Sequence, residues 1–186
     1  IGVLDSILQS SVNSSILFND TLTDQIAEGV FVKGSNFWIR NINRNRNVSS
    51  SEARSSIGFD SESNGFALGA QIDVNGNENY KLGFSLSSIF SKDKLKDALG
   101  SSSSDSIFAS IYGIANRDLS YKSFNSKLFT SFSLGFGHHN TDNSRKVYNS
   151  GIAATALSDS ETLEYNIGLQ IGLKTKFKND FFITPR

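Results

Sequence analysis

The chain has 186 residues with 18 basic and 18 acidic side chains, so its net charge is zero and no basic excess predicts a nucleic-acid partner. Its mean hydropathy of -0.24 and the absence of a long apolar run exclude a membrane-spanning helix, but not the alternating strands of a membrane barrel. The chain has no cysteine, which excludes disulfides, thiolate catalysis and Cys-ligated metals. Serine and asparagine are abundant and are interleaved with 15 phenylalanines, a pattern typical of neither a disordered tail nor an ordinary soluble core.

The residue pattern of the first part of the chain predicts an α-helix. Apolar residues from Val3 to Ile26 recur mostly at three- and four-residue spacing, the period of an α-helix. The serines and asparagines between them are weak helix formers, so such a helix would be marginal in water and better held inside a surrounding structure. Residues Asn19–Thr21 offer N-cap side chains and predict that a second short helix begins there and ends near Gly29.

From Asn36 onward the hydrophobic period becomes two, which predicts β-strands. Six segments are strand-like: 36–46, 66–74, 80–90, 105–116, 128–136 and 163–177. Residues rich in Asn, Gly, Ser and Asp predict breaks between them, at 75–79, 101–104, 116–118 and 178–180.

The strand pattern favours an all-β, antiparallel transmembrane β-barrel preceded by an α-helical linker. The alternation is sustained well beyond the usual strand length of about five or six residues. The face opposite the apolar one carries Gly, Ser, Asn and Gln, which suits a crowded, hydrated lumen. We expect the lumen-facing residues to include Arg40, Gly65, Gly69, Gln71, Asp73, Gly83, Asn166 and Gln170.

Three arginines share one face of the first strand, because Arg40, Arg44 and Arg46 are separated by even numbers of residues. In a barrel they would face acidic residues of neighbouring strands or of the helix; the candidate partners are Asp60, Glu62 and Asp73. The alternative is a solvated strand extension outside the membrane.

A succession of short motifs follows the helical segment in a characteristic order. They are Phe37–Arg40, Gly58–Asp60, Gly65–Ala70, Tyr80–Leu86, Ala109–Gly113, Ser133–His139 with Arg145, and Phe182–Pro185. No single motif is specific, but their order and spacing over residues 15–186 resemble the β-domain of bacterial autotransporters, the type V secretion translocator.

This resemblance implies an outer-membrane translocator that anchors and helps export an N-terminal passenger domain through or with its barrel. Residues 1–35 would be the helical linker or plug, and residues 36–186 the N-terminal part of the barrel. The implied location is the bacterial outer membrane, and the implied partners are outer-membrane lipid, the protein's own passenger and the barrel-assembly machinery. The alternatives are a small outer-membrane adhesin or porin-type barrel and a soluble, secreted β-sandwich adhesin.

Two features depart from the family pattern. Gln71 occupies the acidic position of the glycine-rich strand, although Asp73 lies two residues on and faces the same side. The family barrel has twelve strands and ends on an aromatic residue, whereas this chain offers six or seven strands and ends at Arg186. We therefore expect the N-terminal half of a translocator domain, which does not close into a pore by itself.

No catalytic, metal or cofactor site is expected. His138 and His139 are adjacent on a strand and face opposite sides, so they cannot simply chelate one metal. The serine-rich sequence has no Gly-x-Ser-x-Gly elbow, and the glycines of the strands lack the helix and Lys-Ser/Thr pair of a phosphate loop.

One self-processing step is implied by the resemblance. Some autotransporters release their passenger by asparagine cyclisation inside the barrel, and Asn13–Ser14 lies in the region where such cleavage would occur. Nothing in the sequence marks the acidic residue that this reaction would need.

Overall fold

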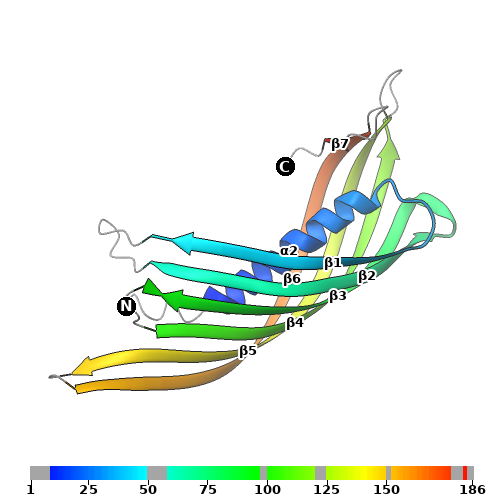
Figure 1. Ribbon diagram of the computed structural model, residues 1–186. Coiled ribbons are helices and arrows are strands. Elements are labelled where there is room, and N and C mark those ends of the chain that lie inside the picture. The colour runs from blue at the N-terminus through cyan, green and yellow to red at the C-terminus, as the bar shows by residue number, and fades with distance from the viewer. Residues whose placement is uncertain are drawn as a thin grey trace.

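A computed structural model describes residues 9–49, 58–96, 100–119, 125–149, 152–176 and 182–183. The described residues form one helix and one strongly curved sheet, and the sheet wraps around the helix so that β1 and β6 lie on opposite sides of it (Figure 1). The elements are α2 (Gln9–Gly29), β1 (Asn36–Val48), β2 (Phe59–Val74), β3 (Asn77–Leu95), β4 (Gly100–Asp118), β5 (Asn125–Asn149), β6 (Ile152–Lys176) and β7 (Phe182–Ile183).

The helix is continuous through the position where the sequence predicted a second helix to begin, and that prediction is wrong. Asn19–Thr21 lie inside α2. Thr21 donates its hydroxyl hydrogen to the Leu17 carbonyl at 2.8 Å, one turn back, instead of capping a new helix. The apolar residues on either side, from Leu17 to Ile26, are buried against the sheet, and this tertiary contact outweighs the local capping signal.

The seven strands form an antiparallel meander in which each strand pairs with its sequence neighbour. The sheet is not closed in the part of the chain that the structure describes. This arrangement confirms the predicted fold class, an incomplete antiparallel barrel of six to seven strands behind a helical linker. No helix among the described residues is both long enough and apolar enough to cross a bilayer.

The connections agree only partly with the predicted breaks. Asn75 and Gly76 form the tight turn between β2 and β3, with φ values of 52° and 72°, as a type I′ hairpin requires. The predicted break at 101–104 is wrong, because these serines lie within β4 and pair with β5. Residues 116–118 mark the end of β4, and residues 178–180 lie outside the described part of the chain.

Glycines make room for large side chains on the concave face of the sheet. In five successive strand pairs a glycine stands directly opposite a bulky residue; the pairs are Trp38–Gly69, Gly65–Ile89, Gly83–Tyr112, Phe108–Gly137 and Phe129–Gly172. A Cβ on Gly69 would lie 2.5 Å from the Trp38 ring, and one on Gly172 would lie 2.6 Å from the Phe129 ring. The five large side chains therefore lie flat over the backbone of the neighbouring strand, which leaves space for α2.

We expect Gly83→Ala to destabilise the barrel, because the added methyl group would overlap the Tyr112 ring. Overpacking of this kind costs about 1–3 kcal/mol. The matched control is Gly113→Ala, whose new Cβ would have its nearest neighbour at 3.6 Å, on Leu82. The measurement is the temperature at which the folded protein converts to the gel mobility of the unfolded chain. Equal midpoints for the two variants would contradict this packing role.

Candidate functional site

The convex face of the sheet carries a continuous apolar belt. One row of laterally paired residues shows its composition: Phe37, Ala70, Phe84, Ile111, Leu134 and Ile167. On β6 the belt runs from Leu163 to Leu173, with Leu169 74% exposed. Ten residue steps at about 3.3 Å, on a strand tilted by about 40°, cover about 25 Å along the bilayer normal, the height of a lipid-facing band.

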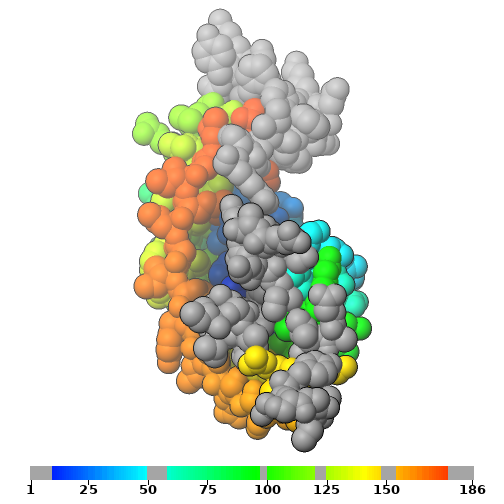
Figure 2. All heavy atoms as spheres, turned by 90° about the vertical axis from the view of Figure 1, so that its left-hand side faces the viewer, coloured from blue at the N-terminus to red at the C-terminus, as the bar shows by residue number. Residues whose placement is uncertain are grey.

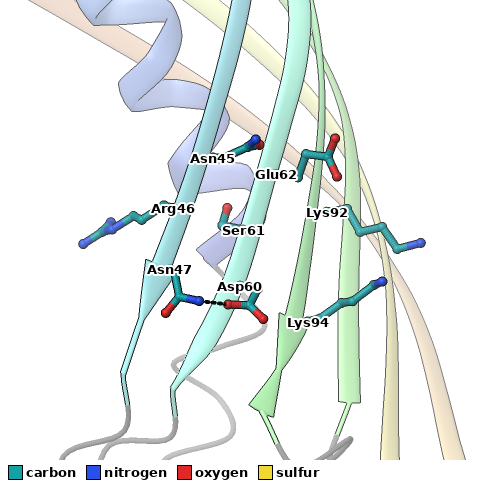
Figure 3. A pocket seen from close by; sticks show the side chains of 8 residues that line it. All are labelled: Asn45, Arg46, Asn47, Asp60, Ser61, Glu62, Lys92 and Lys94. Atoms are coloured by element: carbon teal, nitrogen blue, oxygen red, sulfur yellow. Dashed lines mark hydrogen bonds between the residues drawn. The ribbon is translucent and has the colours of Figure 1, made fainter.

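Beyond the belt, the strands continue as a polar extension. Here the outer face carries Asn45, Asn47, Asp60, Glu62, Lys92 and Lys94, which with Arg46 and Ser61 line a hollow of about 560 Å³ (Figure 3). Asn47 donates a hydrogen bond to Asp60 at 2.7 Å, drawn as the dashed line in Figure 3. The two acids lie on β2, and each stands opposite a lysine of β3, Asp60 opposite Lys94 and Glu62 opposite Lys92.

The concave face is polar and faces the helix. Serines 61, 63, 85, 87, 91, 102, 104, 106 and 110 are all buried on it. Strand alternation places all eight residues predicted to face a lumen on this side. Of these, Arg40 and Gln71 contact α2 directly, Asp73 binds the linker after it, and Gly65, Gly69 and Gly83 stand opposite large side chains. Asn166 bonds to Glu164 and Gln170 accepts from Ser131.

Hydroxyl pairs hold the first turns of α2 to the sheet. The Ser10 and Ser102 hydroxyls are 2.8 Å apart, and those of Ser14 and Ser91 are 2.7 Å apart. These small side chains let helix and sheet approach closely while the four hydroxyls remain hydrogen-bonded. In Figure 2, which looks along the strands from this end, the helix lies between β6 and the strands β1 and β2.

An aromatic and acidic cluster holds the middle of the helix. Phe18, only 1% exposed, stacks on Phe108 with ring centroids 4.7 Å apart. His139 packs edge-on against Phe108 and lies 3.1 Å from the Glu164 carboxylate, to which Ser15 of the helix also donates a hydrogen bond. The prediction that the two histidines face opposite sides is confirmed, because His139 is buried and His138 is not.

Charged pairs connect the C-terminal half of α2 to β1. Arg40 pairs with Glu28 and donates to Gln25 at 2.9 Å, and Arg44 lies 3.6 Å from Asp20. The three candidate partners proposed from the sequence are therefore wrong for these arginines, and the helix supplies their acids instead.

The geometry explains why the candidate partners fail. Asp60 and Glu62 have the strand parity of the convex face, and Asp60 bonds to Asn47 there. Asp73 faces the concave side but forms an ion pair with Lys81 at 2.5 Å.

The sheet also caps the C-terminal end of the helix. The helix has no basic residue in its last turn, and its terminal carbonyls lack partners within the helix. Wall side chains donate to the carbonyl groups of this end: Gln71 to Gly29 at 3.1 Å, Lys174 to Ala27 at 2.9 Å, and Lys81 to Val32, just past the helix, at 2.5 Å. Cations at the negative end of the helix dipole are stabilising.

Asn13, the candidate cleavage residue, lies beside an acidic side chain. Its side-chain nitrogen is 3.1 Å from the Ser61 hydroxyl and 3.5 Å from Oδ1 of Asp93, while Oδ2 of Asp93 is buried without a partner among the described residues. Asp93 lies beyond Phe90, the last apolar belt residue of β3. Burial raises the pKa of the Asp93 carboxyl above its ordinary value, against the opposing hydrogen bonds from Ser61 and Asn13.

Sequence reasoning missed several of these contacts. Strand alternation alone places Lys81 and Asp93 on the same face as Gln71, so it could have identified both as helix-facing charges. Strand and helix periods alone do not show how α2 is placed against the sheet, and this placement brings Asn13 to Asp93 and Ser15 to Glu164. In the described part of the chain, no group of three or more metal-ligating side chains comes together.

A curved antiparallel meander with an apolar outer belt, a polar concave face and a helix seated on that face defines an outer-membrane type of β-barrel domain. A family model described as the autotransporter beta-domain matches residues 37–186. The match covers most of the chain, which therefore belongs to the autotransporter β-domain family, as the resemblance predicted. The family is one of translocators rather than catalysts and is typically outer-membrane. A search of curated proteins found no match.

We expect Phe18→Ala to weaken the docking of the helix strongly, because it removes the stacked ring from a buried site. Phenylalanine-to-alanine changes in a packed core cost about 3–5 kcal/mol. The control is Ile16→Ala, on the same helix but with a side chain 43% exposed. Hydrogen exchange of the α2 amides measures the effect. Equal protection of the α2 amides in the two variants would show that the stacking does not hold the helix in place.

Proposed function

We propose that this chain is part of an autotransporter translocator that anchors in the bacterial outer membrane and helps export an N-terminal passenger domain through or with its barrel. Residues 1–35 act as the linker and plug, and residues 36–186 as the N-terminal part of the barrel. The observation that carries the proposal is the seating of α2 on the polar concave face by contacts along its whole length, from Ser10 to Ala27. A passenger attached before the helix would emerge at the end of the strand extension.

The two faces of the sheet support different partners. The apolar belt suits outer-membrane lipid, and the barrel-assembly machinery is the partner that would insert such strands. The residues predicted to face the lumen, including Arg40, Gln71 and Asp73, line the side on which the exported chain would lie.

The anchoring role predicts a strong effect of Leu169→Arg in the full-length protein. A charged residue on the lipid face near the bilayer midplane costs about 2–4 kcal/mol. The control is Thr155→Arg on the same strand, because Thr155 is exposed on the extension, outside the belt. We expect the first variant to lower passenger display at the cell surface and the amount of heat-modifiable barrel in the outer membrane, and the second to change neither. Normal display from Leu169→Arg would count against a membrane-embedded β6.

A second candidate activity is self-cleavage at the Asn13–Ser14 bond, and the approach of Asn13 to Asp93 favours it. The Asp93 carboxylate would accept a proton from Nδ2 of Asn13, and Nδ2 would then attack the Asn13 carbonyl carbon. A succinimide forms at Asn13 as the peptide bond to Ser14 breaks, and the proton passes to the departing amino group of Ser14. No water, metal or cofactor is consumed in this step.

This chemistry predicts that Asn13→Gln and Asp93→Asn both abolish or greatly slow the release of the passenger. Removal of a positioned general base typically lowers a rate by about 100-fold or more. Because the Asp93 carboxylate is the active form and burial raises its pKa, the rate should increase as the pH rises through a value above the ordinary aspartate range. Ser11→Ala, on the same helix, is the control. Release at unchanged rate from Asn13→Gln, measured by the size of the barrel fragment in outer membranes, would exclude this cleavage site.

A further inference from the structure

Helix α2 carries a stripe of acidic residues along one of its faces. Asp20, Asp24 and Glu28 are spaced four residues apart, so they lie along one face of α2. The helix from Gln9 to Gly29 contains no Lys, Arg or His. The three acids are therefore the only charged side chains of α2. A positively charged surface can bind them without competition from cations of the same helix.

The complementary surface is the arginine row of β1. Glu28 pairs with Arg40, and Asp20 pairs with Arg44. Eight residues of helix advance about 12 Å. Four residues of strand advance about 13 Å. The two acids and the two arginines are thus spaced almost equally, and the two pairs can form together at one position of the helix along the strand.

The hydroxyl contacts by themselves define this position poorly. Ser10, Ser11, Ser14 and Ser15 repeat at one-turn intervals, and the wall opposite them offers many serines. A shift by one turn would bring Ser10 to the place of Ser14, beside Ser91, and would bring Ser14 to the place of Phe18. Hydroxyl pairs can form in both positions. In the shifted position Asp24 would take the place of Glu28 beside Arg40, but Ile16 would take the place of Asp20 beside Arg44, so only the observed position forms both ion pairs.

The ion pairs have the properties of a positioning device rather than of a strong anchor. The Arg44 and Asp20 side chains are 47% and 59% exposed, so their attraction is screened and contributes little to stability. Charge complementarity at such a surface acts mainly on specificity and register, because like charges placed together are costly.

We propose that Arg40 and Arg44 form a two-point recognition site for the acidic stripe and set the depth at which the helix stops in the conduit. This inference rests on the proposed translocator function: the exported chain would slide until Asp20 and Glu28 meet the two arginines. The partner that the site fits is a helix with carboxylates eight residues apart and no nearby cation.

The test uses engineered disulfides in the full-length protein in outer membranes, because this chain has no native cysteine. Ser14→Cys with Ser91→Cys reports the observed register, since the two hydroxyl oxygens lie 2.7 Å apart. Ser10→Cys with Ser91→Cys reports a shift of one helical turn. Each cysteine pair is then combined with one of three sets of changes. The wall reversal is Arg40→Glu with Arg44→Glu on β1, and the helix reversal is Asp20→Arg with Glu28→Arg on α2. The fourfold variant carries all four changes.

We expect the wall reversal or the helix reversal alone to lower the 14–91 crosslink relative to the 10–91 crosslink by about fivefold or more, because each places like charges together. The fourfold variant should restore the parent ratio. Arg46→Glu is the matched control: it makes the same charge change on the same face of β1, where Arg46 lies over the Phe59 ring, and it should leave the ratio unchanged.

The proposal is overturned if the helix reversal leaves the parent ratio unchanged, if the fourfold variant does not restore it, or if the parent gives no 14–91 crosslink in a correctly inserted barrel. The helix reversal alters no barrel strand, so it tests the proposal even where the wall reversal fails to insert. Passenger display and heat modifiability are followed in the same cells. Normal display with an unchanged ratio refutes the register site alone, whereas a parent protein that inserts no barrel refutes the translocator function itself.

Discussion

Strict alternation of side chains across each strand is the constraint on which the rest of this structure depends. Every strand must present apolar residues to one side and a surface that accepts a helix to the other, and a shift of register by one residue would exchange the two faces. The five pairings of a glycine with a large residue keep the second face low enough for α2, because each large ring or side chain covers the backbone of its neighbour instead of projecting inward. The same sequence features, the alternation of side chains and the glycine pairings, thus underlie both the curvature of the sheet and the seat of the helix.

The helix depends on the sheet because its own sequence stabilises it poorly. Serine, threonine and asparagine occupy much of α2, and no basic side chain caps its last turn. The sheet supplies what is missing, with a ring for Phe18 to stack on, hydroxyls for Ser10 and Ser14, and lysines for the terminal carbonyls. Lys81 and Lys174 are almost completely buried, which would be costly for unpaired charges. Their bonds to helix-end carbonyls, and that of Lys81 to Asp73, offset this cost.

The sequence predicted what alternation alone determines and failed where distant contacts decide. The long strands, the turn at Asn75–Gly76 and the inward position of Gln71 follow from period and turn chemistry. The predicted helix start at Asn19 was wrong, because a residue suited to capping a helix N-terminus looks the same in the sequence when it lies inside a helix. The serine run 101–104 predicts a break because serine is common in loops, yet its residues alternate between the two faces of β4.

The partners of the arginines show the same limit most clearly. From the sequence, Asp60 and Glu62 were the nearest acids in the neighbouring strand, but their parity turns them to the opposite face. The partners found, Asp20 and Glu28, belong to a different element, and only the three-dimensional arrangement of α2 on the sheet brings them to β1. Asp93 likewise becomes meaningful only when α2 brings Asn13 to it.

The contacts of α2 are distributed unequally about the Asn13–Ser14 bond. Before it, among the described residues, Ser10 contacts Ser102, and Asn13 contacts Ser61 and Asp93. After it lie the stacked ring of Phe18, both arginine pairs and the capped C-terminal carbonyls. Cleavage at this bond would therefore leave the Phe18 stack, both arginine pairs and the capped carbonyls with the part of the helix that remains in the barrel. On the proposed function, the passenger would leave while the remaining helix stays seated, and the charges of the concave face would keep their partners.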